Sequence, residues 1–160
     1  IPLAKAICQA KVSGLFDVVI ASPGGHPKDI NVYQAQKGLA HASLITKNGG
    51  TIVLAAACPE GTGSRGYERW VTERRSQEEV LSHFAAEGFR VGPHKAFQIA
   101  RDATRVRVLL VSEMSPDFVR RLLLTPVDSL QAAVDTAVAP LPRSARIGVM
   151  PKANATIPLL

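Results

Sequence analysis

Three polar side chains whose chemistry suits an anion lie close together in the sequence: Tyr33, Gln34 and Lys37. In a helix, Lys37 would lie about 40° around the axis from Tyr33 and Gln34 about 100°, with Lys37 between the other two. The resulting patch offers a phenol, an amide and an ammonium group, a set that can bind a carboxylate and a neighbouring hydroxyl group. On periodicity alone, however, a polar face opposite an apolar stripe is usually only solvated. The opposite stripe consists of Val32, Ala35, Leu39 and Ala42.

Two glycine-rich loops can bring further groups to this patch. Residues 22–28 and 58–66 each follow a predicted strand, and ligands of open α/β sheets bind beyond the carboxyl ends of the strands. Glycine lets the backbone approach a ligand closely, and the first loop leads into a helix N-terminus that favours an anion. His26 and Glu60 lie in these loops and are further candidates for contact with a ligand. Residues 62–66 resemble a phosphate cradle but lack the lysine of a Walker loop.

No complete catalytic or metal-binding set is present in the sequence. The four histidines, His26, His41, His83 and His94, share no spacing typical of metal ligands. Cys8 and Cys58 are not spaced as a metal pair, and Cys58 fits a buried thiol at a strand end better than a nucleophile. We therefore predict no metal site and no catalytic residue in this chain. So few cysteines indicate free thiols in the cytoplasm.

The positive charge of the chain does not by itself indicate nucleic acid. The net charge is +6 and the isoelectric point about 9.8. The basic residues are scattered and alternate with acidic residues rather than with stacking aromatic side chains. This pattern is typical of solvated helix faces. An anionic small substrate or an acidic partner domain would use the remaining charge. No apolar run is long enough to span a membrane, so we expect neither a nucleic-acid nor a membrane partner.

Strands and helices are predicted to alternate along the chain. Buried strands are predicted at residues 17–22, 51–57, 106–112 and 146–150. Helices are predicted from an N-cap at Asp29 to about residue 45 before the turn at 48–50, from the Ser76–Glu79 capping box to Gly88, at 93–100, at 117–123, and from Asp128 or Ser129 to about 138. This order favours a three-layer α/β fold, Rossmann-like, with a mainly parallel sheet flanked by helices. Residues 1–160 would form one domain with its core at about 15–150, and the apolar ends at 1–14 and 151–160 would pack on a missing N-terminal domain.

Residues 17–37 resemble the C-terminal domain of the nickel-pincer-dependent lactate racemase family. The similarity continues through 49–57 and 58–61 and, more loosely, through 92–96. Its most specific positions are Gly24, Gly25, Asp29, Tyr33, Gln34 and Lys37.

This resemblance implies the C-terminal domain of a two-domain enzyme that racemises or epimerises small 2-hydroxy acids. In that family a hydride moves between the substrate's α-carbon and a nickel pincer nucleotide. The catalytic histidines, the nickel-ligating histidine and the lysine that tethers the cofactor belong to the missing N-terminal domain. The C-terminal domain closes over the site, so Tyr33, Gln34 and Lys37 would face substrate and cofactor. Lys95 and Phe97, in and beside the more loosely similar segment, are further candidates for that surface.

Two positions depart from the family pattern. His26 stands where many members have an aromatic residue such as tyrosine, and Phe97 stands where some have tryptophan. Both leave the identity of the 2-hydroxy acid open. The alternative interpretation of the chain is a stand-alone anion- or nucleotide-binding α/β module without catalysis.

Overall fold

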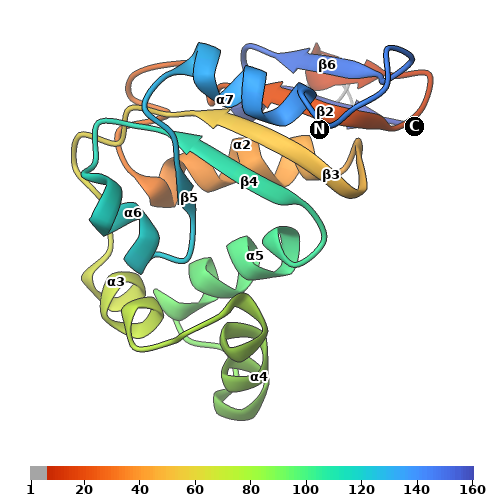
Figure 1. Ribbon diagram of the computed structural model, residues 1–160. Helices are drawn as coiled ribbons and strands as arrows, with labels where there is room; N and C mark the ends of the chain where they lie inside the picture. Colours follow the sequence, from red (N-terminus) through yellow and green to blue (C-terminus); the bar gives the residue numbers. More distant parts are fainter. Residues whose placement is uncertain (1–6) are drawn as a thin grey trace.

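The computed structural model describes residues 7–160 and is built on a five-stranded parallel sheet (Figure 1). The strand order is β5-β4-β3-β2-β6, and every pairing in it is parallel. The strands are β2 (Phe16–Ala21), β3 (Thr46–Ala55), β4 (Arg107–Val111), β5 (Thr125–Pro126) and β6 (Ile147–Met150). The strands predicted at 17–22, 51–57 and 106–112 are confirmed as β2, β3 and β4, which are neighbours in the sheet. The short strand β5 was not predicted.

Helices cover both faces of this sheet, which confirms the three-layer α/β fold. Alternate strand residues point to opposite faces. Val19 and Ile52 belong to the core on the side of α2 (Val32–Ser43) and α5 (Pro93–Ala103), whereas Val18 and Val53 pack against α7 (Leu130–Val138). Figure 1 shows α7 on the opposite side of the sheet from α2.

Three further helices extend the layer that contains α2 and α5. They are α3 (Arg65–Thr72), α4 (Gln77–Glu87) and α6 (Pro116–Arg121). Helix α3 was not predicted, whereas α4 has the predicted N-cap, because the Glu79 N–H donates to Ser76 Oγ at 3.2 Å. The Glu79 carboxylate accepts from the Arg75 N–H at 2.7 Å, so only half of the predicted capping box forms. Ser129 rather than Asp128 caps α7.

The N-terminus of α2 corrects the sequence prediction. Asn31, not Asp29, is the N-cap, since its Oδ1 accepts from the Gln34 N–H at 3.1 Å. Asp29 joins the loop to the end of β3 instead: its carbonyl accepts from the Cys58 N–H at 2.8 Å and its carboxylate from the Ala57 N–H at 3.4 Å. Both residues are good N-caps by type, and this long-range pairing decides between them.

The C-terminal end of α2 is also earlier than predicted. The helix ends at Ser43, and β3 begins at Thr46, so residues 48–50 lie inside the strand rather than in a turn after the helix. The pairing of β2 with β3 shifts register between Phe16 and Val18, which accommodates these residues as a bulge. Gly49, at a φ of 76°, supplies the positive backbone angle there.

The two ends of the chain meet each other. Strand β1 (Gln9–Lys11) pairs in parallel with β7 (Ile157–Leu159), and Ala153 of the 3₁₀ turn η1 (Ala153–Ala155) is fully buried in the core that includes α2. Neither strand was predicted. Residues 1–6 lie outside the described residues, and packing of the two ends on another domain stays a prediction. No helix in residues 7–160 has both the length and the apolar character needed to cross a membrane.

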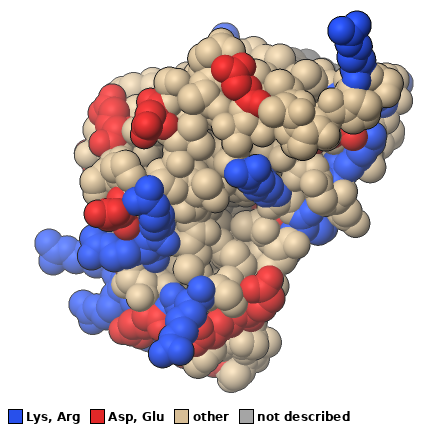
Figure 2. Space-filling model, viewed as in Figure 1, with Lys and Arg blue, Asp and Glu red and all other residues tan. Residues whose placement is uncertain are grey.

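Charges of both signs share the surface of the helical layer, as the sequence predicts. In Figure 2, basic and acidic side chains lie next to one another over the lower part of the molecule, where Figure 1 places α3 and α4. Arg90 pairs with Glu87 at 3.3 Å, and Arg120 with Asp117 at 2.7 Å. Exposed pairs of this kind contribute little to stability, roughly 0–1 kcal/mol each.

Candidate functional site

The loops at the carboxyl ends of β2 and β3 join at the start of α2. The N–H groups of Val32 and Tyr33 donate to the carbonyls of Gly61 and Thr62 at 3.0 and 3.1 Å. With the Gln34 N–H bound to Asn31, the first backbone donors of the helix are all occupied within the chain. The predicted free N–H groups at this N-terminus are therefore wrong, because these groups are not available to bind an anion directly. Hydrogen bonds to an anion must come from the side chains of α2 and its neighbours.

The structure brings Gln34 and Lys37 into direct contact. Lys37 Nζ donates to Gln34 Oε1 at 2.6 Å, with Lys37 exposed and Gln34 half-buried. Both line an open depression of about 440 Å³. Its other lining residues are Pro27, Lys28, Ile30 and Asn154. Two lysines and no acidic residue line the depression, so it is electropositive.

Tyr33 lies on the side of the patch that contacts α5. Lys95 Nζ is 4.6 Å from the centre of the Tyr33 ring, and the His94 ring meets it edge to face at 5.9 Å. The Gly92 N–H donates to His94 Nδ1 at 3.1 Å, so the proton of the neutral imidazole is on Nε2. Lys95 of α5 thus lies next to the candidate residues of α2, against the face of the Tyr33 ring.

Lys95 is only 7% exposed and is held by two amides. Its Nζ donates to Gln36 Oε1 at 3.1 Å and to Gln98 Oε1 at 2.9 Å. Burial lowers the pKa of the Lys95 ammonium, and the positive charge of Lys37 lowers this pKa further.

The other predicted candidates lie around this patch rather than in it. His26 and Glu60 are exposed residues of the two neighbouring loops. Phe97 follows Lys95 by two residues, which turns it about 200° around α5. Its ring stacks on Phe84 of α4 at 4.7 Å, with 22° between the ring planes. Contact of these three residues with a ligand stays a prediction.

Asn154 is a residue of the site that sequence reasoning missed. Its Nδ2 donates to the carbonyls of Lys28 and Gln34 at 3.2 and 3.1 Å and so joins the first loop to α2. A Cβ on Gly38 would come 2.9 Å from Asn154 Oδ1, which explains why a glycine is needed here. That glycine inside a predicted helix was the available signal of a close neighbour. His94, Gln36 and Gln98 were missed because nothing local indicates that α2 and α5 pack together.

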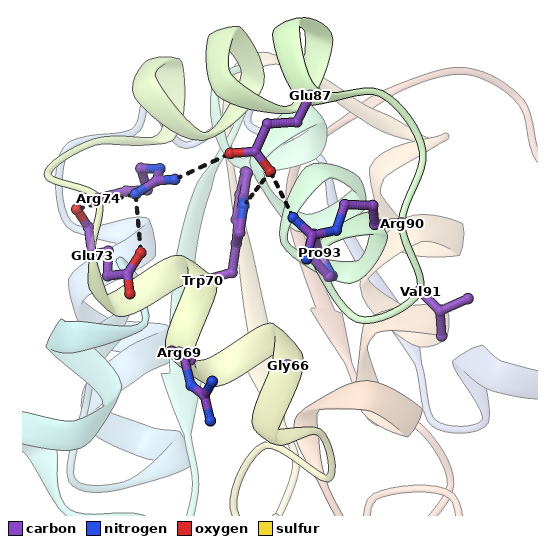
Figure 3. Close-up of a pocket in the computed structure, with 9 residues that line it drawn as sticks. All are labelled: Gly66, Arg69, Trp70, Glu73, Arg74, Glu87, Arg90, Val91 and Pro93. Atoms are coloured by element: carbon purple, nitrogen blue, oxygen red, sulfur yellow. Dashed lines mark hydrogen bonds and ion pairs between the residues drawn. The ribbon is translucent and has the colours of Figure 1, made fainter.

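A second cavity, of about 380 Å³, lies between α3, α4 and α5 (Figure 3). Glu87 accepts from Trp70 Nε1 at 3.1 Å and pairs with Arg74 at 3.7 Å. The Arg74 guanidinium lies 4.8 Å from the centre of the Trp70 ring. Glu87, Arg74 and the Trp70 ring bind one another, so they form a structural network between helices, whereas the Arg69 side chain lines the cavity outside this network.

The described residues provide no metal centre, and the buried Cys58 is not a reactive thiol. Within residues 7–160, no group of three or more His, Cys, Asp or Glu side chains is arranged to hold a metal ion. Cys58 is buried, as predicted, at the end of β3. Burial and then the negative charges of Asp29 and Glu113 raise the pKa of Cys58 to about 12, which keeps the thiol protonated near neutral pH.

Gly63 leaves room for the Asn31 side chain that caps α2. A substitution of Gly63 therefore tests how this N-cap positions the site. Its φ is 69°, and a Cβ there would collide with the side-chain amide of Asn31. Gly63→Ala combines the cost of a left-handed backbone, about 1–2 kcal/mol, with loss of a cap, about 1 kcal/mol. We expect the free energy of unfolding in urea to fall by about 2–3 kcal/mol.

Gly25→Ala is the matched control for this variant. Gly25 has a similar φ of 73°, but nothing lies within 4 Å of its added Cβ, so only the backbone cost of about 1–2 kcal/mol applies. Equal losses in the two variants would show that Gly63 does not act through the Asn31 cap.

Comparison with known proteins assigns the fold to a family. Residues 12–157 match the family model of the lactate racemase C-terminal domain. The lactate racemase of Thermoanaerobacterium thermosaccharolyticum is 30% identical over 139 residues, which cover 84% of this chain and 33% of that protein. The lactate racemase of Lactiplantibacillus plantarum is 29% identical with the same coverage. The chain thus spans about one third of the length of these relatives.

Solved structures agree with this assignment. The lactate racemase apoprotein of T. thermosaccharolyticum superposes with a TM-score of 0.92 and 27% identity over 99% of this chain and 39% of that one. A Thermotoga maritima protein shares the fold, with a TM-score of 0.65 and 13% identity. The family match, which spans nearly the whole chain, and the shared parallel sheet lead to one conclusion: the chain belongs to the lactate racemase C-terminal domain family.

Proposed function

We propose that this chain closes over substrate and cofactor as the C-terminal domain of a nickel-dependent racemase or epimerase of 2-hydroxy acids. The observation that carries the proposal is the patch on α2, where Lys37 and Gln34 are already joined by a hydrogen bond beside Tyr33. These residues stand at the most specific positions of the resemblance to the family. The patch has a surplus of positive charge and faces away from the sheet.

In this proposal each residue of the patch has a separate task. Lys37 pairs with the substrate carboxylate, because its exposed ammonium can reach a ligand that covers α2. Gln34 holds Lys37 through Oε1 and donates from Nε2 to the same ligand. Tyr33 packs its ring against the ligand and offers its hydroxyl. Closure of the two domains removes water from the site between them, which strengthens the charge interactions of Lys37.

The chemistry of the reaction requires groups that residues 7–160 do not provide. When bound, the nickel pincer nucleotide supplies a group that accepts a hydride from the substrate's α-carbon and returns it. The described residues offer no cluster of metal ligands, so the nickel would be held by the N-terminal domain. Lys37 and Gln34 fit the anionic and polar parts of a ligand that lies between the two domains.

A chimeric enzyme tests the proposal. Residues 12–157 of this chain would replace the C-terminal domain of the T. thermosaccharolyticum lactate racemase, and racemisation of lactate would be followed by chiral chromatography. We expect the cofactor-loaded chimera to racemise lactate or a related 2-hydroxy acid. We expect no activity from this chain alone or from the truncated relative alone, because each lacks half of the site. A folded chimera that binds nucleotides but turns over no 2-hydroxy acid would favour a binding module without catalysis.

A further inference from the structure

Lys95 is a buried ammonium whose observed partners are neutral. Lysine is almost never buried unless it is paired with an acid. The groups that face Lys95 are Tyr33, Gln36 and Lys37 from α2 and His94 and Gln98 from α5. None of these five side chains is negatively charged near neutral pH. Among residues 7–160, no ion pair within 4.0 Å involves Lys95.

The hydrogen bonds explain the position of Lys95 but do not require its charge. Two amide oxygens and the face of an aromatic ring account for the three directions in which the ammonium can donate. A neutral side chain of similar length would join α2 to α5 without the cost of desolvating a charge. A purely structural contact would therefore cost less free energy of desolvation without the ammonium group. Structural contact alone therefore does not explain the positive charge of Lys95 beneath the Tyr33 ring, and this charge indicates a functional role.

We propose that Lys95 is a positioning residue of the candidate site, which holds the Tyr33 ring from below and supplies a second positive charge for an anionic ligand bound at Lys37. The inference rests on the proposed function and deepens it. Lys95 does not touch the ligand in this arrangement, because the Tyr33 ring separates them. The rings of His94 and Tyr33 pack in a T-shaped arrangement, and the Gly92 N–H donates to His94 Nδ1.

Binding of an anion and protonation of Lys95 must then favour each other. In the free protein, burial and the nearby Lys37 lower the pKa of Lys95. A bound anion opposes both effects and raises this pKa again. By linkage, ligand affinity is highest below the free-state pKa of Lys95 and falls as the pH rises through it. Without the Lys95 charge, this part of the pH dependence should disappear.

Lys95→Gln and Lys95→Arg in the cofactor-loaded two-domain enzyme test the inference. Glutamine keeps hydrogen-bonding groups but loses the charge, whereas arginine keeps the charge. We expect Lys95→Gln to raise KM for lactate about tenfold with less than about threefold change in kcat, because the charge acts on bound substrate and transition state alike. Its KM should no longer rise at alkaline pH with the Lys95 titration. Lys95→Arg should restore most of the affinity, and Arg143→Gln, at an exposed arginine in the loop before β6, should leave KM unchanged.

A measurement on the unsubstituted enzyme keeps the test independent of folding of the variants. With ¹³C-labelled lysine, NMR can follow the ε-carbon of Lys95, assigned by its loss in Lys95→Arg. We expect its pKa to lie below those of the exposed lysines and to rise when lactate is added. Unchanged KM and pH dependence in a folded Lys95→Gln enzyme, or a Lys95 pKa that lactate does not move, would overturn the inference. If Lys37→Ala still impairs the enzyme, only the role of Lys95 fails; if it does not, the proposed function fails as well.

Discussion

Lys37→Ala in the two-domain enzyme is expected to lower kcat/KM for lactate by at least about 30-fold. A lysine that pairs with a carboxylate in a cleft poor in water is worth on the order of 2–5 kcal/mol if its removal leaves the anion unpaired. Each 1.36 kcal/mol corresponds to about a factor of ten in rate, which sets the lower limit of the expected loss. The loss should exceed that of Lys95→Gln, because Lys37 would contact the ligand and Lys95 would act through Tyr33.

The fold should tolerate this substitution. Lys37 is exposed, and its hydrogen bond to Gln34 lies on the surface of α2. Steady-state racemisation and thermal unfolding would be measured side by side, with Arg143→Ala in the loop before β6 as the control for loss of one exposed charge. If a correctly folded Lys37→Ala enzyme keeps kcat/KM within twofold, the patch is only a solvated helix face and the resemblance misleads at this position.

The sheet was predictable because its long strands have a characteristic local sequence pattern. Continuous runs of β-branched residues, as in Val18–Ile20 of β2 and in the second half of β3, are typical of strands buried on both faces. Strands β1 and β7 span three residues each and pair across almost the whole chain. Short runs of this kind carry no periodicity, so their pairing depends on a contact that no local pattern encodes.

Helix α3 was missed for a different reason, since its pattern was present. Tyr67, Trp70 and Val71 are its buried residues and follow the i, i+3, i+4 spacing of a helix, and Ser64 is a suitable N-cap. The glycines of the preceding loop, at 61, 63 and 66, made the segment resemble a continuous loop. The boundary of α2 was misplaced because two suitable N-caps, Asp29 and Asn31, stand two residues apart.

The candidate site was predictable only as far as it is local. The geometry of one helix places Tyr33, Gln34 and Lys37 near one another; in the structure Lys37 contacts Gln34, whereas Tyr33 packs against α5. The position of Lys95 under Tyr33 arises from packing between α2 and α5, whose contacting side chains Gln36 and Lys95 are 59 residues apart. The prediction of free N–H groups at the N-terminus of α2 was wrong, because carbonyls of the second loop accept from them, a contact that requires both loops to be placed first.

The two faces of α2 should respond to substitution in opposite ways, and Leu39→Ala tests the apolar one. Leu39 is 1% exposed within the main core, and truncating a buried leucine leaves a cavity that costs about 2–5 kcal/mol. We expect the free energy of unfolding to fall by about 3 kcal/mol and Tm by about 10 °C in this 160-residue chain.

Leu44→Ala at the C-cap of the same helix is the matched control, because Leu44 is 53% exposed and its loss should cost less than about 0.5 kcal/mol. Urea and thermal unfolding of both variants give the comparison. In the two-domain enzyme, the fraction of Leu39→Ala that remains folded should keep its KM for lactate, since none of the ligand-facing side chains changes. A loss below about 1 kcal/mol for Leu39→Ala, or unfolding caused by Lys37→Ala, would show that the packing and ligand-binding faces of α2 are not separate.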